Sequence, residues 1–152
     1  MTVKLSTGLR NALLGQDGMS KIFTGGVIEL RSGVQPVTAD AAPTGTLLGV
    51  VTVNGQAWIA GNPANGLVFA APNGGVLTKN SDHWMMFGLA AGTIGWWRLL
   101  TNAPDDGSAS TTLCRIDGSA GVGAGDLWVS TTNVTIGSPA TADVFAIELP
   151  AS

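Results

Sequence analysis

A chain of 152 residues with a formal net charge of −3 and only 11% charged residues is long enough for one folded domain. Its seven basic residues are few and scattered, which argues against nucleic acid and anionic membranes as partners. A single cysteine, Cys114, and a single histidine, His83, exclude an intrachain disulfide and a two-histidine metal site. The sparse charge and the mean hydropathy of +0.32 predict that protein partners cover part of the surface.

The first 24 residues are expected to form a helical segment or arm, followed by one β-domain over residues 25–152. Ser6 or Thr7 can cap a helix that ends near Leu14, and Leu9 and Leu13 recur at i, i+4 spacing. Residues 19–23 can add another turn before two glycines. We expect this helix to close one end of the β-domain; the alternative is an arm that docks on a neighbour.

Short apolar stretches separated by Gly, Pro, Asn and Asp follow at regular spacing, which is typical of an all-β domain. We expect an antiparallel β-sandwich, jelly-roll-like. Asn54-Gly55 between two apolar stretches is the strongest local hairpin signal, because a type I′ turn needs positive φ at both central residues. Strands are expected at residues 27–31, 46–53, 56–60, 67–71, 76–79, 95–100, 111–116, 126–130, 133–136 and 143–149. Residues 82–91 fit neither period cleanly, and we expect a strand there, with a short helix as the alternative.

The stretch 93–115 organises the rest of the chain as an apolar strand, a polar turn and a returning antiparallel strand. Period-2 alternation places Trp96 and Trp97 on opposite faces of the first strand. Leaving both indoles in water would forfeit several kcal/mol, since each buries ~150–250 Å² at ~25 cal/mol per Å². Both faces should therefore be covered, one by the core and the other by another layer, the N-terminal segment or another subunit.

No catalytic or metal-binding motif stands out, so we expect a protein that is not an enzyme and has no cofactor. Asp105 and Asp106 lie in a turn, where paired aspartates usually bind backbone N–H groups, and Asp40 is expected to cap or form an Asx turn. The stretch GVGAGD at 121–126 lacks the Lys-Ser/Thr of a phosphate loop. Cys114 is expected to be a small buried hydrophobe and His83 to be structural or solvated. No apolar run reaches the ~20 residues of a membrane span, and no export signal is recognised.

The residues expected to carry packing or interfaces are apolar and aromatic: Leu9, Leu13, Trp58, Trp84, Trp96, Trp97 and Trp128. An alternative is a glycan-binding module, in which Trp58, Trp84 or Trp128 stacks on sugar rings.

Several stretches together resemble a group of small virion proteins of tailed bacteriophages. The matching stretches are LSTGLRNALLG at 5–15, GGVIELRSG at 25–33, PVTADAAPTGTLLGVVT at 36–52, GTIGWWRLL at 92–100 and CRIDGSAG at 114–121. The resemblance covers nearly the whole chain and rests on strand and turn patterns.

The resemblance implies a structural component of the virion, assembled in the host cytoplasm, with no functional residues to carry over. Shell decoration or cementing of the capsid is the leading role, with the major capsid protein or other virion proteins as partners. A neck or tail accessory protein is the alternative. The low charge and the two-faced tryptophan strand further predict a homo-oligomer, a dimer or trimer.

Overall fold

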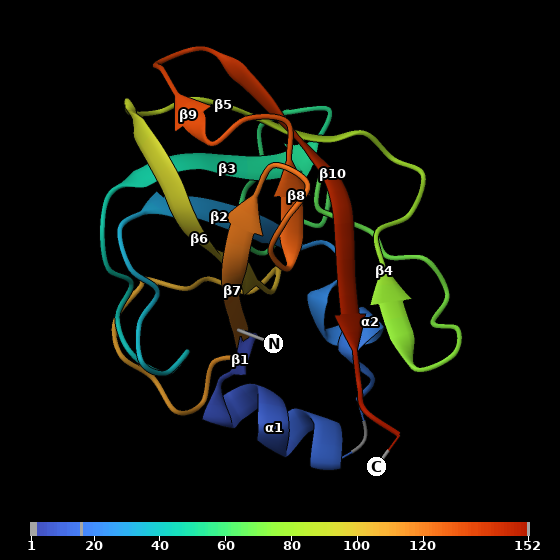
Figure 1. Ribbon diagram of the computed structural model, residues 1–152. Helices are drawn as coiled ribbons and strands as arrows, with labels where there is room; N and C mark the ends of the chain where they lie inside the picture. Colours follow the sequence, from blue (N-terminus) through green and yellow to red (C-terminus); the bar gives the residue numbers. More distant parts are fainter. Residues whose placement is uncertain (1–2, 16, 152) are drawn as a thin grey trace.

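The computed structural model describes residues 3–15 and 17–151 and shows an all-β fold with two short helices (Figure 1). The helices are α1 (Thr7–Leu14) and α2 (Met19–Phe23). The strands are β1 (Lys4–Leu5), β2 (Val27–Ser32), β3 (Leu47–Val53), β4 (Val76–Thr78), β5 (Trp84–Phe87), β6 (Gly92–Leu100), β7 (Arg115–Gly121), β8 (Leu127–Val129), β9 (Asn133–Val134) and β10 (Pro139–Glu148).

Seven of these strands close into a barrel-like ring. Their order is β6, β7, β8, β10, β5, β3, β2 and back to β6. All neighbours in the ring are antiparallel except β7 and β8, which are parallel. Strands β1, β4 and β9 attach to β7, β10 and β6 respectively. The all-β prediction is confirmed, whereas the sandwich or jelly roll is not, because closure joins the strands into one continuous sheet.

Two expected strands, 56–60 and 67–71, are absent from the strands of the described chain, so those predictions are wrong. Asn54 and Gly55 do adopt positive φ of 54° and 64°, as a type I′ turn requires. The turn nevertheless opens a loop, because β5 pairs with β3 in the place of residues 56–60. Residues 67–71 contribute only the isolated bridge between Phe69 and Lys79.

The central hairpin is confirmed as an antiparallel pair of β6 and β7, but its second strand begins later than expected. Residues 111–114 stay outside the strand, and the Ser110 hydroxyl accepts hydrogen bonds from the backbone N–H groups of Thr112 and Leu113. Strand β7 then continues through Gly118 to Gly121, past the expected end of the strand at residue 116. Gly118 is required there because the Trp97 indole occupies the space of a side chain.

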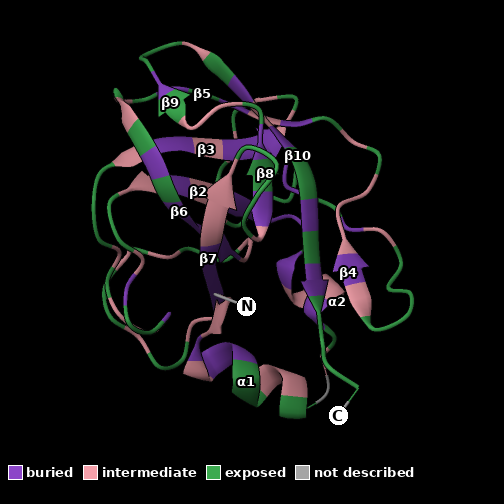
Figure 2. Cartoon of the chain, in the orientation of Figure 1, coloured by how far each residue is buried: buried purple, intermediate pink, exposed green. Residues whose placement is uncertain are grey.

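The barrel interior is filled by aromatic and branched side chains. Figure 2 colours the buried positions along the strands purple. Phe145 of β10 contacts Trp97 of β6 and Trp84 of β5, with ring centroids 5.4 and 5.7 Å apart. Phe69 meets Trp84 edge-on at 5.4 Å. Strands β5, β6 and β10 therefore all contribute a ring to one aromatic cluster, and the size of this cluster fixes the distance between the strands.

The N-terminal segment closes the lower end of the barrel in Figure 1 rather than reaching away from it. Leu9 and Phe23 are fully buried in the same core, and β1 pairs with β7. Ser6 caps α1 by accepting from the N–H of Leu9 at 3.2 Å, and it also accepts from the N–H of Arg115 at 2.8 Å. The helix cap thus joins the helix to the start of β7.

Gly118→Ala is expected to lower the free energy of unfolding by about 1–3 kcal/mol, because rigid neighbours cannot make room for the added methyl. An ideal Cβ at Gly118 would lie only 2.3 Å from Cζ2 of the Trp97 indole. Urea unfolding followed by tryptophan fluorescence measures the change.

Gly18→Ala is the matched control, because Gly18 has a φ of −83° and no atom within 4 Å of the added Cβ. Gly18 is the N-cap of α2, where Ala is less favourable than Gly, so the effect of Gly18→Ala on the free energy of unfolding should stay below about 1 kcal/mol. Equal losses of unfolding free energy in the two variants would contradict the close approach of the Trp97 indole to Gly118.

Candidate functional site

The outer face of β6 is covered by the chain's own loops, not by another subunit. Arg98 and Asp117 are 1% and 0% exposed and form a two-pronged ion pair, with Nε to Oδ1 at 2.6 Å and Nη2 to Oδ2 at 2.7 Å. Arg98 also donates through Nη1 to the carbonyl of Ala41 in the loop between β2 and β3. Trp96 is fully buried beside it, its ring centroid 5.4 Å from the guanidinium carbon. Both indoles of β6 are thus covered, as the sequence predicted.

A second ion pair fixes the loop of residues 101–114 between β6 and β7. Arg115 donates to both carboxylate oxygens of Asp105 at 2.6 and 2.7 Å and to the carbonyl of Ser108 at 2.8 Å. Burial acts to raise the pKa of Asp105, but the hydrogen bonds from Arg115 and from the Gly107 N–H outweigh it and hold that pKa below its ordinary value. The charged form of Asp105 therefore stabilises the folded loop.

Asp40 links both loops to the N-terminal helix. Its two carboxylate oxygens accept from the backbone N–H and the hydroxyl of Thr7, each at 2.7 Å, and its carbonyl accepts from the N–H of Ser110 at 2.8 Å. The hydroxyl of Thr7 is the main cause that lowers the pKa of Asp40. Asp40 was expected to cap or form an Asx turn; its carboxylate instead accepts from Thr7 in the first turn of α1, 33 residues away in sequence.

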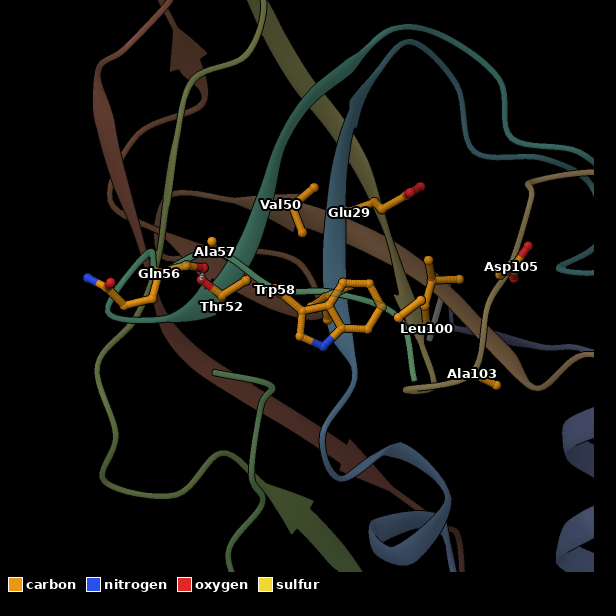
Figure 3. A pocket seen from close by; sticks show the side chains of 11 residues that line it. Glu29, Val50, Thr52, Gln56, Ala57, Trp58, Leu100, Ala103 and Asp105 are labelled. Carbon is orange, nitrogen blue, oxygen red and sulfur yellow. Dashed lines mark hydrogen bonds between the residues drawn. The ribbon is translucent and has the colours of Figure 1, made fainter. Parts of the chain in front are cut away.

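Beside these ion pairs, the outer face of β3, β2 and β6 forms the floor of a groove of about 290 Å³ (Figure 3). Apolar side chains of Val27, Val50 and Leu100 line it together with Glu29 and Trp58. The loop after Asn54-Gly55 forms one wall, and residues 103–105 form the other. A smaller hollow of about 90 Å³ shares Glu29, Leu100 and Asp105 and extends the groove toward Arg31 and Arg98.

The structure separates the residues expected to carry packing or interfaces into three groups. Leu9, Trp84, Trp96 and Trp97 are fully buried, so Trp84 offers no platform for a sugar ring. Leu13 packs partly buried against the core. Trp58 is partly exposed in the groove, and Trp128 is 42% exposed on the outside of β8.

The remaining groove residues were missed by the sequence analysis. Glu29 was not singled out as a site residue, and Asp105 was expected only to serve its own turn. Strand alternation did place Arg98 beside Trp96, and a buried guanidinium on that face needs a carboxylate partner. That requirement was the available signal for Asp117.

Six of the exposed large apolar side chains lie in two patches. On β8 and β10, Trp128 and Val144 are paired neighbours and are 42% and 41% exposed, with Val122 in the adjoining loop. We call these three residues the Trp128 patch. The second patch joins Phe87, Leu89 and Ile136, and backbone hydrogen bonds of Gly88 with Ser138 and Gly137 hold its two segments together.

Two other titratable residues named from the sequence, His83 and Cys114, do not line the groove. His83 is exposed, and burial raises the pKa of the partly buried Cys114 thiol. Within residues 3–15 and 17–151, no three His, Cys, Asp or Glu residues are grouped as a metal site would require. In the same part of the chain, no helix combines the length and apolar character needed to cross a membrane.

Comparison of the chain with protein-family models, curated proteins and solved structures found no match. The resemblance to phage virion proteins stays a prediction.

Asp105→Asn is expected to lower the free energy of unfolding by about 3 kcal/mol at pH 7, because Arg115 loses its charged partner in a buried site. Folding lowers the pKa of Asp105 below the ~3.9 of an unfolded chain, so its contribution is complete above that pH. The contribution is lost as the pH falls through the lower folded value. The difference in the free energy of unfolding between the wild type and the variant should therefore shrink below about pH 4. Urea unfolding at a series of pH values measures it.

Asp17→Asn serves as the control, because Asp17 forms an exposed pair with Lys21 at 2.6 Å. It should cost less than about 1 kcal/mol. A gap for Asp105→Asn that stays constant from pH 7 to pH 2.5 would contradict the role assigned to the carboxylate.

Proposed function

We propose that the protein is a non-enzymatic structural component of a tailed-phage virion that binds other virion proteins through the outside of its barrel. The observation that carries the proposal is the Trp128 patch. Trp128 and Val144 lie directly opposite one another on neighbouring strands, and each is about two-fifths exposed. An aromatic residue at the centre of an apolar patch is the usual anchor of a protein interface.

The closed barrel supports such a role because it presents the patch on a rigid surface. The strands under Trp128 belong to the ring, and the inward neighbours Leu127, Val129 and Phe145 are buried in the core. Little conformational entropy is then lost when a partner covers the patch. With 11% charged residues, the chain also has few groups whose desolvation would oppose the contact.

Decoration or cementing of the head, by contact with the major capsid protein, is the specific role that we favour. We also propose that the protein forms a dimer or trimer. We further propose that the barrel is flattened into a jelly-roll-like form, because small jelly-roll or sandwich proteins that cement capsids have similar size and composition. A neck or tail accessory protein would use the same patch on a different partner.

Mass spectrometry of purified parent particles tests this proposal. We expect a copy number close to that of the major shell protein. A few copies per particle would reassign the protein to the neck or tail, and absence from the particles would overturn the virion proposal.

Trp128→Ser is expected to weaken binding to particles that lack the protein by at least about tenfold, because it removes the proposed anchor of the interface. Sedimentation of particles with added purified protein measures the bound fraction. The control is Val37→Ser, since Val37 is 88% exposed and lies outside the patch. Unchanged binding of Trp128→Ser would remove the patch from the interface.

A further inference from the structure

The groove beside Trp58 combines a fixed aromatic ring with hydrogen-bonding groups over an apolar floor. Figure 3 shows the indole lying across β2 between Val50 and Leu100, with its ring nitrogen directed away from Glu29. This nitrogen donates to the carbonyl of Gly25 at 2.8 Å. The polar edge of the indole is therefore satisfied by the protein, and its ring remains available for contact with a ligand.

The wall that carries Trp58 is held in place before any ligand binds. Asn102 donates through its amide to the carbonyls of Gly25 and Asn62, both at 2.9 Å, and its own carbonyl accepts from the N–H of Gly61 at 2.6 Å. Thr52 donates its hydroxyl to the carbonyl of Gln56 at 2.7 Å, which fixes the start of the wall. A ligand would bind without having to order this loop.

Both carboxylates that line the groove already have a guanidinium partner. Glu29 is paired with Arg31 at 2.9 Å and Asp105 with Arg115 at 2.6 Å, while Arg98 is paired with Asp117 under the same surface. An anionic ligand finds no free cation here, and a cationic ligand would compete with an existing pair. The groove therefore selects for a ligand without net charge.

The polar groups point to a ligand with hydroxyls. Arg31 occupies only one oxygen of Glu29, Oε2, so the other can accept from a ligand. The side chain of Gln56 is exposed at the wall and offers both a donor and an acceptor. A purely apolar ligand would leave Glu29 desolvated without a partner, which is costly.

We propose that this groove binds a neutral pyranose unit of a polysaccharide, with one face of the sugar ring on Trp58 and its hydroxyls on Glu29 and Gln56. A pyranose has both an apolar C–H face and a rim of hydroxyls, which matches the two kinds of surface. The volume of about 290 Å³ lies near the lower end of the ~300–1,000 Å³ of small-molecule sites and suits one or two rings. This proposal is independent of the virion proposal, which would still stand if the groove bound no sugar.

NMR spectroscopy of the intact chain tests the site directly, because each of the five tryptophans carries one indole N–H group whose signal can be assigned. The probes are hexasaccharides of α-glucan, β-glucan, β-mannan, β-galactan and N-acetylglucosamine, with hexagalacturonate as an anionic counterpart and adenosine as a neutral ring without a pyranose. We expect at least one neutral hexasaccharide to shift the Trp58 signal while the signals of the buried Trp84, Trp96 and Trp97 stay in place.

Trp58→Ala is expected to weaken that binding by at least about tenfold, whereas Trp58→Phe, which keeps a ring, should retain most of it. Glu29→Gln, which keeps the size of the side chain, should weaken it by about threefold or more by removing a charged acceptor. Trp128→Ala is the matched control and should bind as the wild type does. The signals of the buried tryptophans verify that each variant is folded.

Three results would overturn the proposal. The first is no shift of the Trp58 signal with any neutral hexasaccharide at millimolar concentration. The second is a response to hexagalacturonate or adenosine alone. The third is binding that survives in Trp58→Ala but is lost in Trp128→Ala.

Discussion

The structure depends on covering both faces of β6. This strand lies between β2 and β7 and carries Trp97 inward and Trp96 and Arg98 outward, and all three side chains are buried. The inner face is covered by the aromatic core. The outer face can be covered only if the guanidinium of Arg98 is matched, because an unpaired buried charge is prohibitively costly. Asp117 provides that match, and burial raises its pKa against the pull of Arg98. The pair therefore specifies which loops pack here more than it adds to stability.

From this constraint follows the form of the molecular surface. Arg98 holds the loop between β2 and β3 over the sheet by its hydrogen bond to the carbonyl of Ala41. Arg115 holds the loop of residues 101–114 by its hydrogen bonds to Asp105 and Ser108. Neither loop covers the adjoining part of β3, β2 and β6, and that uncovered part is the Trp58 groove. In the ring of seven strands, β2 lies opposite the β8–β10 pair. The Trp58 groove and the Trp128 patch thus occupy opposite sides of one rigid barrel, so a protein partner on one side leaves the other side open.

Local sequence rules predicted what depends on near neighbours. Alternation placed Trp96 and Trp97 on opposite faces, Ser6 was expected to cap α1, and Asn54-Gly55 formed its expected turn. What the rules missed depends on partners distant in sequence. The edge of β3 at Thr52 and Val53 pairs with β5, about 30 residues later, rather than with the stretch that follows the turn. The parallel contact of β7 and β8, which lets the sheet close, has no local signature. The groove could not be predicted from the sequence for the same reason, because Glu29, Trp58 and Asp105 come together only when the barrel closes.

The most direct test of this account is a cryo-electron microscopy map of the parent particle at a resolution that shows side chains. The account predicts the barrel seated on a neighbouring virion protein with Trp128 and Val144 buried in the contact and the Trp58 groove facing solvent. A map in which the β8–β10 face is free, or in which the groove of β3, β2 and β6 is filled by a neighbouring protein, would contradict it.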